Sequence, residues 1–121
     1  MTEPSPTTKK FNKELNSGTV ALVLLGVLGR SSEALYGYQI VKRLGAQDVG
    51  MMKQGALYPV LRSLERSRFL ASTVEPSLSG PPRRYYSITD EGRLALDEWS
   101  GIWHHYRDFV DTVLEGTSHV Q

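Results

Sequence analysis

Hydrogen-bond donors recur on one face of a helix predicted near the middle of the chain. Tyr58, Arg62 and Arg66 follow one another every four residues, which places them on one side of a helix. The apolar stripe on the opposite side consists of Leu57, Leu61 and Leu64. Gln54 at the helix start can pair with adenine and Arg62 with guanine or a phosphate, while Gly55 lets backbone N–H groups approach a phosphate closely.

A second set of donors follows in the segment Gly80-Pro81-Pro82-Arg83-Arg84-Tyr85-Tyr86. The turn-rich residues 76–82 separate a weakly alternating strand, residues 69–75, from a returning strand, residues 84–89. This pattern predicts a hairpin with Arg83 and Arg84 at its tip, where an arginine can enter a minor groove or clamp a phosphate. A basic helix followed by a basic-tipped hairpin is typical of a winged helix-turn-helix DNA reader.

Each feature taken alone also has a plainer interpretation. The helix can be an ordinary surface helix, in which Arg62 and Arg66 are solvated and Tyr58 covers the edge of the core. The winged-helix shape can also serve as a protein-interaction module that docks a partner through the wing or the third helix. Salt dependence separates the two functions, because binding through several phosphates weakens steeply as salt rises.

The complete pattern predicts a mainly α fold with a small β-hairpin (α+β), a winged helix-turn-helix followed by a long C-terminal helix. Helices are expected over residues 12–28, 36–45, 54–66 and 90–114, the last ended by Gly116. We expect a disordered arm at 1–10, the DNA-binding domain at 11–89, the C-terminal helix at 90–116 and a tail at 117–121. The candidate DNA-binding residues are Tyr38, Lys53, Gln54, Gly55, Tyr58, Arg62, Arg66, Arg83 and Arg84.

The last predicted helix carries an apolar seam whose members step alternately by three and four residues, as in a heptad repeat. The seam consists of Leu96, Trp99, Trp103, Tyr106, Val110 and Val113. So small a domain is not expected to hide two tryptophans of one stripe by itself, so we expect a homodimer built on this helix with help from the first. Such a dimer would set two reading helices about one duplex turn apart, which suits a palindromic promoter site.

Composition excludes several classes of function. The 121 residues contain no cysteine, and no spacing resembles a metal site or a nucleophile motif, so we expect neither an enzyme nor a cofactor or metal. Residues 1–10 lack the apolar stretch of a secretory signal, and the longest apolar run is too short to cross a bilayer, which predicts a cytoplasmic protein. Nine basic and four acidic residues lie in 30–89, against two basic and seven acidic in 90–121, so only the middle of the chain suits a polyanion.

Four motifs in the same order resemble the PadR-like transcriptional regulators, over roughly residues 16–103. They are Leu35-Tyr36-Gly37-Tyr38-Gln39-Ile40, Gly55-Ala56-Leu57-Tyr58-Pro59 with Leu61-Arg62-Ser63-Leu64-Glu65, Gly80-Pro81-Pro82-Arg83-Arg84-Tyr85-Tyr86, and Ile88-Thr89-Asp90-Glu91-Gly92. The length is similar to the short-tailed subgroup, with one long helix after the winged helix. Two positions depart from the family: Ala56 stands where threonine is common, and Arg68 where glycine is usual.

The resemblance implies a homodimeric repressor that excludes polymerase from a promoter, often its own. Some members of the family bind flat aromatic effectors between tryptophans of the last helix. Trp99 and Trp103 are therefore candidate effector-binding residues, with plain interface packing as the alternative for both.

Overall fold

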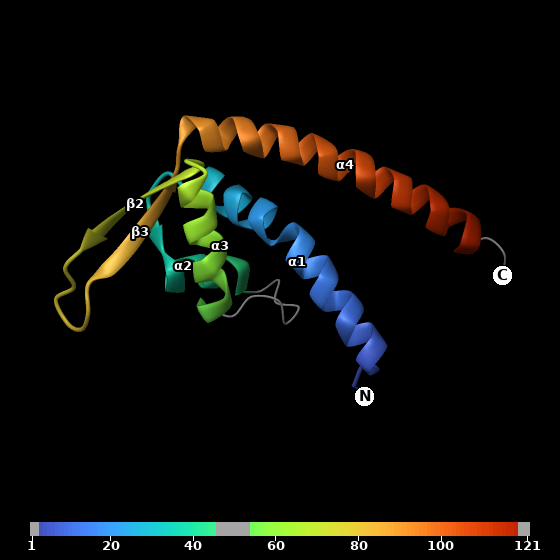
Figure 1. Cartoon of the computed structure of the whole chain (residues 1–121), viewed down its shortest axis with the longest axis horizontal. Coiled ribbons are helices and arrows are strands. Elements are labelled where there is room, and N and C mark those ends of the chain that lie inside the picture. The colour runs from blue at the N-terminus through green and yellow to red at the C-terminus, as the bar shows by residue number, and fades with distance from the viewer. Residues whose placement is uncertain (1–2, 46–53, 119–121) are drawn as a thin grey trace.

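The computed structural model describes residues 3–45 and 54–118, and it shows a compact head from which two long helices diverge (Figure 1). The elements in chain order are α1 (Pro6–Gly29), β1 (Leu35–Tyr36), α2 (Gly37–Leu44), α3 (Gln54–Arg66), β2 (Leu70–Glu75), β3 (Arg83–Ile88) and α4 (Asp90–Ser118). The predicted fold class, mainly helical with a small antiparallel sheet, is confirmed. The β2–β3 hairpin projects from the head on the side opposite to the C-terminal end of α4 (Figure 1).

The first helix begins at Pro6, not near residue 12 as predicted. Ser5 caps it, because the Ser5 hydroxyl accepts a hydrogen bond of 3.1 Å from the backbone N–H of Thr8. Proline suits the first helical turn, since its missing N–H would have no partner there. Residues 6–10, assigned from the sequence to a disordered arm, therefore belong to α1.

A third strand joins the predicted hairpin. The sheet has the order β1-β3-β2 and is antiparallel throughout, with Leu35 opposite Tyr86 and Tyr36 opposite Tyr85. Tyr36 therefore ends β1 and caps α2, rather than starting the second helix as predicted. Its backbone N–H donates to the Gln39 side chain at 3.1 Å, which satisfies a donor that would otherwise be orphaned at the helix start.

One hydrophobic core joins all the elements of the head. It receives leucines from α1, α3, β1 and β2, Ile40 from α2, Tyr86 from β3 and Ala95 from α4. Only the C-terminal part of α1 enters it, at Leu24, Leu25 and Leu28. The N-terminal part of α1 therefore leaves the head with its apolar side chains uncovered, as Phe11 is 62% exposed.

The turn after α3 contacts the start of the C-terminal helix. Arg68 has the left-handed backbone angle φ 67°, and the Phe69 N–H donates to the Leu64 carbonyl at 3.0 Å, which closes the helix end as a Schellman motif. The Thr89 hydroxyl donates to the Arg68 carbonyl at 2.7 Å and accepts from the Gly92 N–H at 2.9 Å, so it also caps α4. The turn therefore has the left-handed geometry that glycine adopts without strain, with arginine in that conformation.

Gly92 makes this connection possible. A Cβ atom at Gly92 would lie 2.1 Å from the Phe69 carbonyl oxygen, so only glycine lets the first turn of α4 approach the turn after α3. From there α4 runs to Ser118 and passes through Gly116, which was predicted to end it. A glycine weakens a helix, but does not by itself stop one.

Replacing Arg68 with glycine should stabilise the protein by about 1 kcal/mol, because a left-handed residue with a Cβ atom is strained. Denaturant unfolding of Arg68→Gly and Arg68→Ala measures the effect. The alanine variant removes the guanidinium but keeps the strain, so its stability should stay close to that of the unchanged chain. Equal stabilisation by both substitutions would show that the arginine side chain, and not the backbone angle, lowers the stability of the unchanged chain.

Candidate nucleic-acid interface

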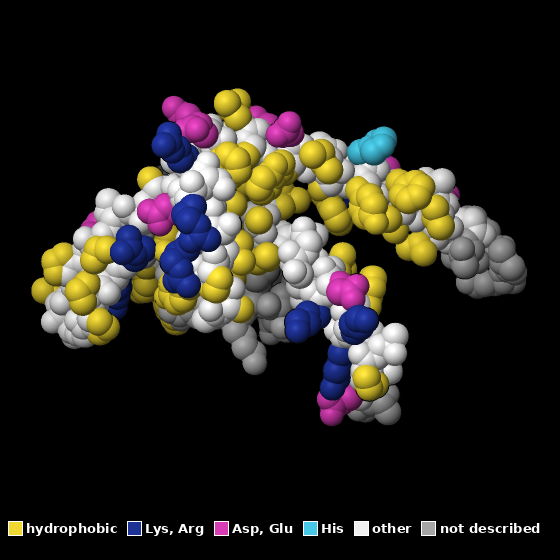
Figure 2. Space-filling model, viewed as in Figure 1, with side chains coloured by type: hydrophobic (Ala, Val, Ile, Leu, Met, Phe, Trp, Pro, Cys, Tyr) yellow, Lys and Arg dark blue, Asp and Glu magenta, His cyan; other side chains and the backbone are white. Residues whose placement is uncertain are grey.

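Helix α3 has one buried and one exposed face, as its sequence predicts. Leu57 and Leu61 are fully buried in the core, while Arg62 and Arg66 are exposed. The basic side chains form a strip over α3 in the space-filling view (Figure 2). This strip is not crossed by another element of the described chain in that view, so α3 presents donors on a surface that a groove can reach.

The start of α3 is described only in part. Gln54 is the first residue of the helix and Gly55 is exposed, so the helix N-terminus is where the sequence predicted it. The proposed contact of the Gln54 side chain with a base and the whole of Lys53 lie outside the described residues. The positive end of the helix dipole at this position suits a phosphate.

Tyr58 covers the edge of the core more than it extends from α3. Its ring packs against the core cluster and is half-buried. A Cβ atom at Gly37 would lie 2.5 Å from the Tyr58 hydroxyl oxygen, so the hydroxyl sits directly on the first residue of α2. The sequence left open whether Tyr58 faces a DNA groove or covers the core. In the structure its ring covers the core, and its hydroxyl reaches the surface beside α2.

The two wing arginines point to opposite faces of the hairpin. They were predicted at the tip of the hairpin. Instead they occupy the first two positions of β3, beside the connecting loop. The Arg83 guanidinium lies over the Tyr36 ring, 4.5 Å from its centroid, whereas Arg84 Nη1 donates to the Ser72 hydroxyl at 3.0 Å. Side chains alternate along a strand, so the two neighbouring guanidinium groups have different partners within the chain.

A row of aromatic rings and cations runs from the outer face of the sheet onto α2. Tyr36 makes an edge contact with Tyr85 at 5.2 Å between ring centroids and stacks on Tyr38 at 6.4 Å. The Lys42 ammonium group lies 5.8 Å from the centroid of the Tyr38 ring. Tyr38, predicted to contact DNA, is therefore exposed and held beside a cation on α2.

A cleft between the wing and the start of α2 brings several of these groups together. Its volume is about 380 Å³, and Tyr36, Gly37, Tyr58, Arg83 and Arg84 contribute to its walls together with residues of the wing loop. The Arg83 guanidinium and phenolic hydroxyls near a helix N-terminus favour an anionic partner such as a DNA phosphate.

The buried side of the hairpin is also polar where it meets α3. Burial raises the pKa of the Tyr86 phenol, and the negative charge of Glu65 raises it further, while Arg84 and Arg62 act in the opposite direction. Tyr86 therefore stays neutral at physiological pH and serves as a core residue. The charged groups around it belong to α3 and β3, which shows how closely the two elements approach one another.

A groove lies between α1 and α4, away from the wing. Its volume is about 660 Å³, and both candidate effector residues, Trp99 and Trp103, line it. The remaining walls are Phe11, Glu14, Leu15, Gly18, Thr19, Ala21 and Leu22 of α1 with Ile102 and Tyr106 of α4. Yellow apolar side chains follow the side of α4 that faces α1 (Figure 2).

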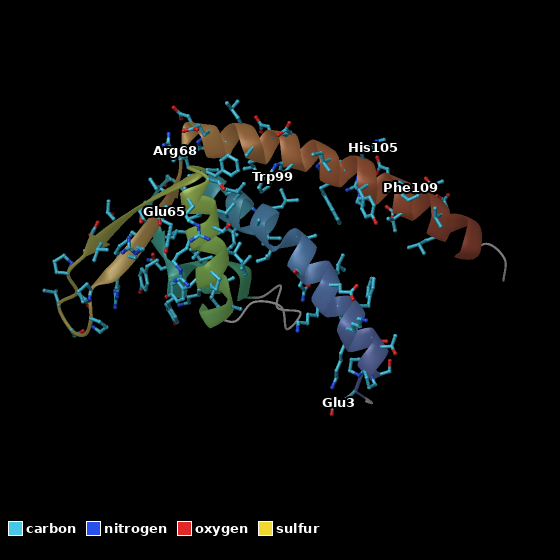
Figure 3. The ribbon with its side chains drawn as sticks, viewed as in Figure 1. Glu3, Glu65, Arg68, Trp99, His105 and Phe109 are labelled. Atoms are coloured by element: carbon cyan, nitrogen blue, oxygen red, sulfur yellow. The ribbon has the colours of Figure 1, made fainter. Side chains whose placement is uncertain are left out.

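The predicted dimer seam is divided between two environments. Leu96 and Trp99 pack against the chain's own core, and the Trp99 ring meets Phe69 edge-on at 5.6 Å between centroids. Figure 3 places Trp99 on the side of α4 that faces the head. Trp103 and Val110 are half-buried, whereas Tyr106 is 58% and Val113 54% exposed. Phe69 and the core cover Trp99 in part, but Trp99 and Trp103 are both only half-buried. That the domain does not hide its two tryptophans by itself therefore stays a prediction.

Neither a metal site nor a membrane-spanning helix is found in the part of the chain that the structure describes. His104 and His105 are adjacent and exposed on α4, and no three histidine or acidic side chains among residues 3–45 and 54–118 gather as a metal site. None of the described helices has the length and apolarity that crossing a bilayer requires.

Four residues around α3, the wing and the start of α2 were not predicted from the sequence to take part in the site: Tyr36, Lys42, Glu65 and Ser72. The alternation of side chains along the predicted strand already separates Arg83 from Arg84 and would have paired Arg83 with the outer face. No local signal marks Ser72 and Glu65, since their contact joins residues on different elements.

Most of this sequence matches a known protein family and solved structures. Residues 24–98 match the profile of the transcriptional regulator PadR-like family. A PadR family transcriptional regulator from Eggerthella lenta is 36% identical with a TM-score of 0.76, covering 90% of this chain and 93% of its own. A PadR-like transcriptional regulator from Bacillus cereus is 28% identical with a TM-score of 0.69, covering 84% and 96%. A search of curated proteins gives no match.

Proposed function

Because the chain belongs to the PadR-like family of transcriptional regulators, we propose that it binds double-stranded DNA as a homodimer and represses transcription. In this proposal α3 enters a major groove, with Lys53, Gln54, Gly55, Tyr58, Arg62 and Arg66 at or near the contact. Tyr38 and the wing lie over the adjacent backbone or minor groove. A cytoplasmic location is part of the proposal, because a transcriptional regulator must reach the DNA.

The observation that carries the proposal is the exposed basic face of α3 beside the wing. Arg62 and Arg66 are exposed on the side of α3 opposite its buried leucines, and the cleft with Arg83 opens next to the start of α2. Phosphate contacts position a protein on DNA and base contacts make it specific. The arrangement supports both kinds of contact from one rigid head.

Dimerisation through α4 and α1 is supported by the apolar surface that these helices leave uncovered. Phe11, Tyr106, Phe109 and Val113 are each more than half exposed, and they lie on the two helices that diverge from the head (Figure 1). A second copy that packs its own helices on this surface would bury the apolar groups of both chains. Two heads related by two-fold symmetry then suit a palindromic promoter site.

Repression would follow from exclusion of polymerase at the occupied promoter, and an aromatic effector would relieve it. The groove between α1 and α4 supports the effector, because two tryptophans offer flat apolar faces on which a planar ring can stack. An effector shifts the heads only if it binds their two arrangements with different affinity. It would therefore act on the spacing or tilt of the two α3 helices.

Arg62→Ala should weaken binding to duplex DNA from the upstream promoter by about 1–3 kcal/mol if Arg62 reads a base. Arg107→Ala is the matched control, since it removes the same charge from an exposed position on α4. Fluorescence anisotropy at two salt concentrations measures both. Equal affinity of both variants and the unchanged chain would remove Arg62 from the interface, and salt-independent binding would favour a protein-docking surface over DNA.

Tyr106→Glu should shift the protein toward monomers at micromolar concentration, because two charges would then lie in the apolar contact between copies. Leu94→Glu places the same charge on an exposed apolar residue of α4 that is outside the seam, and should leave the dimer intact. Sedimentation velocity distinguishes the two species. A Tyr106→Glu dimer as stable as the unchanged one would place the contact between copies elsewhere.

Planar aromatic compounds should quench the tryptophan fluorescence of the unchanged chain, and much less that of Trp103→Ala. Trp103 is the better residue to replace, because Trp99 also packs on Phe69 within the head. Fluorescence titration gives the affinity of each variant. Similar quenching constants for both proteins would contradict an effector site in the groove.

A further inference from the structure

Three polar side chains form a hydrogen-bonded chain between the wing and α3. The Ser72 hydroxyl of β2 donates to Glu65 Oε2 of α3 at 2.6 Å, and Arg84 Nη1 of β3 donates to the same hydroxyl at 3.0 Å. Figure 3 shows Glu65 on the side of α3 that faces the hairpin. We call this chain of contacts the wing strap.

The strap has a fixed direction and charged ends. A serine hydroxyl has one proton to donate, so Ser72 gives it to the carboxylate and accepts from the guanidinium. Both bonds include an ionised group, which makes them shorter and stronger than bonds between neutral groups. Ser72 lies opposite Tyr86, and Val74 lies opposite Arg84, so Ser72 and Arg84 are diagonal neighbours on the inner face of the hairpin.

The hairpin depends on such a contact because, apart from the Arg83–Tyr36 contact on its outer face, little else holds its outer half. Leu70 and Tyr86 anchor the base in the core, but Val74 is 52% exposed and Leu78 in the loop is fully exposed. A two-stranded ribbon without a packed face is marginally stable and twists easily. The strap is a polar contact that joins this ribbon to α3 beyond its base.

We propose that Glu65, Ser72 and Arg84 are positioning residues that set the angle between the wing and the recognition helix. The proposal rests on the proposed DNA-binding function. Arg84 acts on DNA binding through Ser72, while Arg83, on the outer face over Tyr36, makes the wing's contact with a phosphate. Two neighbouring arginines, expected from the sequence to act alike, therefore have different roles.

The test compares Ser72→Ala, Arg84→Ala and the double variant in the full chain. Each single change should weaken binding to promoter duplex roughly three- to tenfold, as expected for one lost hydrogen bond. The double variant should bind the duplex with the same affinity as the single variant that binds less tightly, because both substitutions remove the same contact. Ser72→Thr keeps the hydroxyl and should restore affinity, and Ser87→Ala, on the outer face of β3, is the matched control.

The salt dependence of binding separates positioning from direct contact. Arg83→Ala should reduce the slope of log affinity against log salt by about one, since it removes one phosphate contact. Arg84→Ala should leave this slope unchanged. A slope reduced by about one in Arg84→Ala, together with unchanged affinity in Ser72→Ala, would overturn the proposal and make Arg84 a phosphate contact.

Hydrogen exchange of the free protein tests the strap without DNA. Ser72→Ala and Arg84→Ala should accelerate amide exchange in residues 70–75 and 83–88, and Ser87→Ala should not. If the unchanged chain does not bind duplex DNA, the proposed function fails and this measurement alone decides whether the strap holds the wing. Exchange rates unaltered by both strap variants would overturn the strap.

Discussion

The contact between the turn after α3 and the first turn of α4 is the constraint on which the other parts depend. Arg68 in the left-handed conformation ends α3, and its carbonyl accepts from Thr89, whose side chain caps α4. Gly92 has no side chain, so α4 can approach the Phe69 carbonyl at this point. The end of α3 and the start of α4, the helix that carries the apolar seam, are therefore held in direct contact.

This joint explains how one small domain can connect two surfaces. The basic face of α3 and the cleft beside the wing lie on the head, while the tryptophan groove lies between α1 and α4. Phe69 belongs to the joint and contacts Trp99, which lines the groove. Phe69 therefore lies between Trp99 and the turn that ends α3.

Much of this architecture can be predicted from the sequence, and the failures have physical reasons. Apolar stripes with a helical period predicted α3 and its exposed basic face, because burial of leucines determines which side a helix presents. The start of α1 was misplaced because Ser5 and Pro6 suit a helix start as well as a loop. Strand β1 is too short for alternation to be recognised, and the Ser72–Glu65 contact joins elements whose approach no local pattern records.

The affinity of the purified protein for promoter duplex as a function of salt tests the central claim most directly, because it reports how many phosphates the basic face of the head contacts. A dimer that binds DNA through this face should bind tightly, with two chains per site, in dilute buffer, and its log affinity should fall linearly with log salt, with a slope of roughly −0.9 for each phosphate contacted. Absence of duplex binding in dilute buffer, or an affinity that does not change with salt, would contradict the central claim.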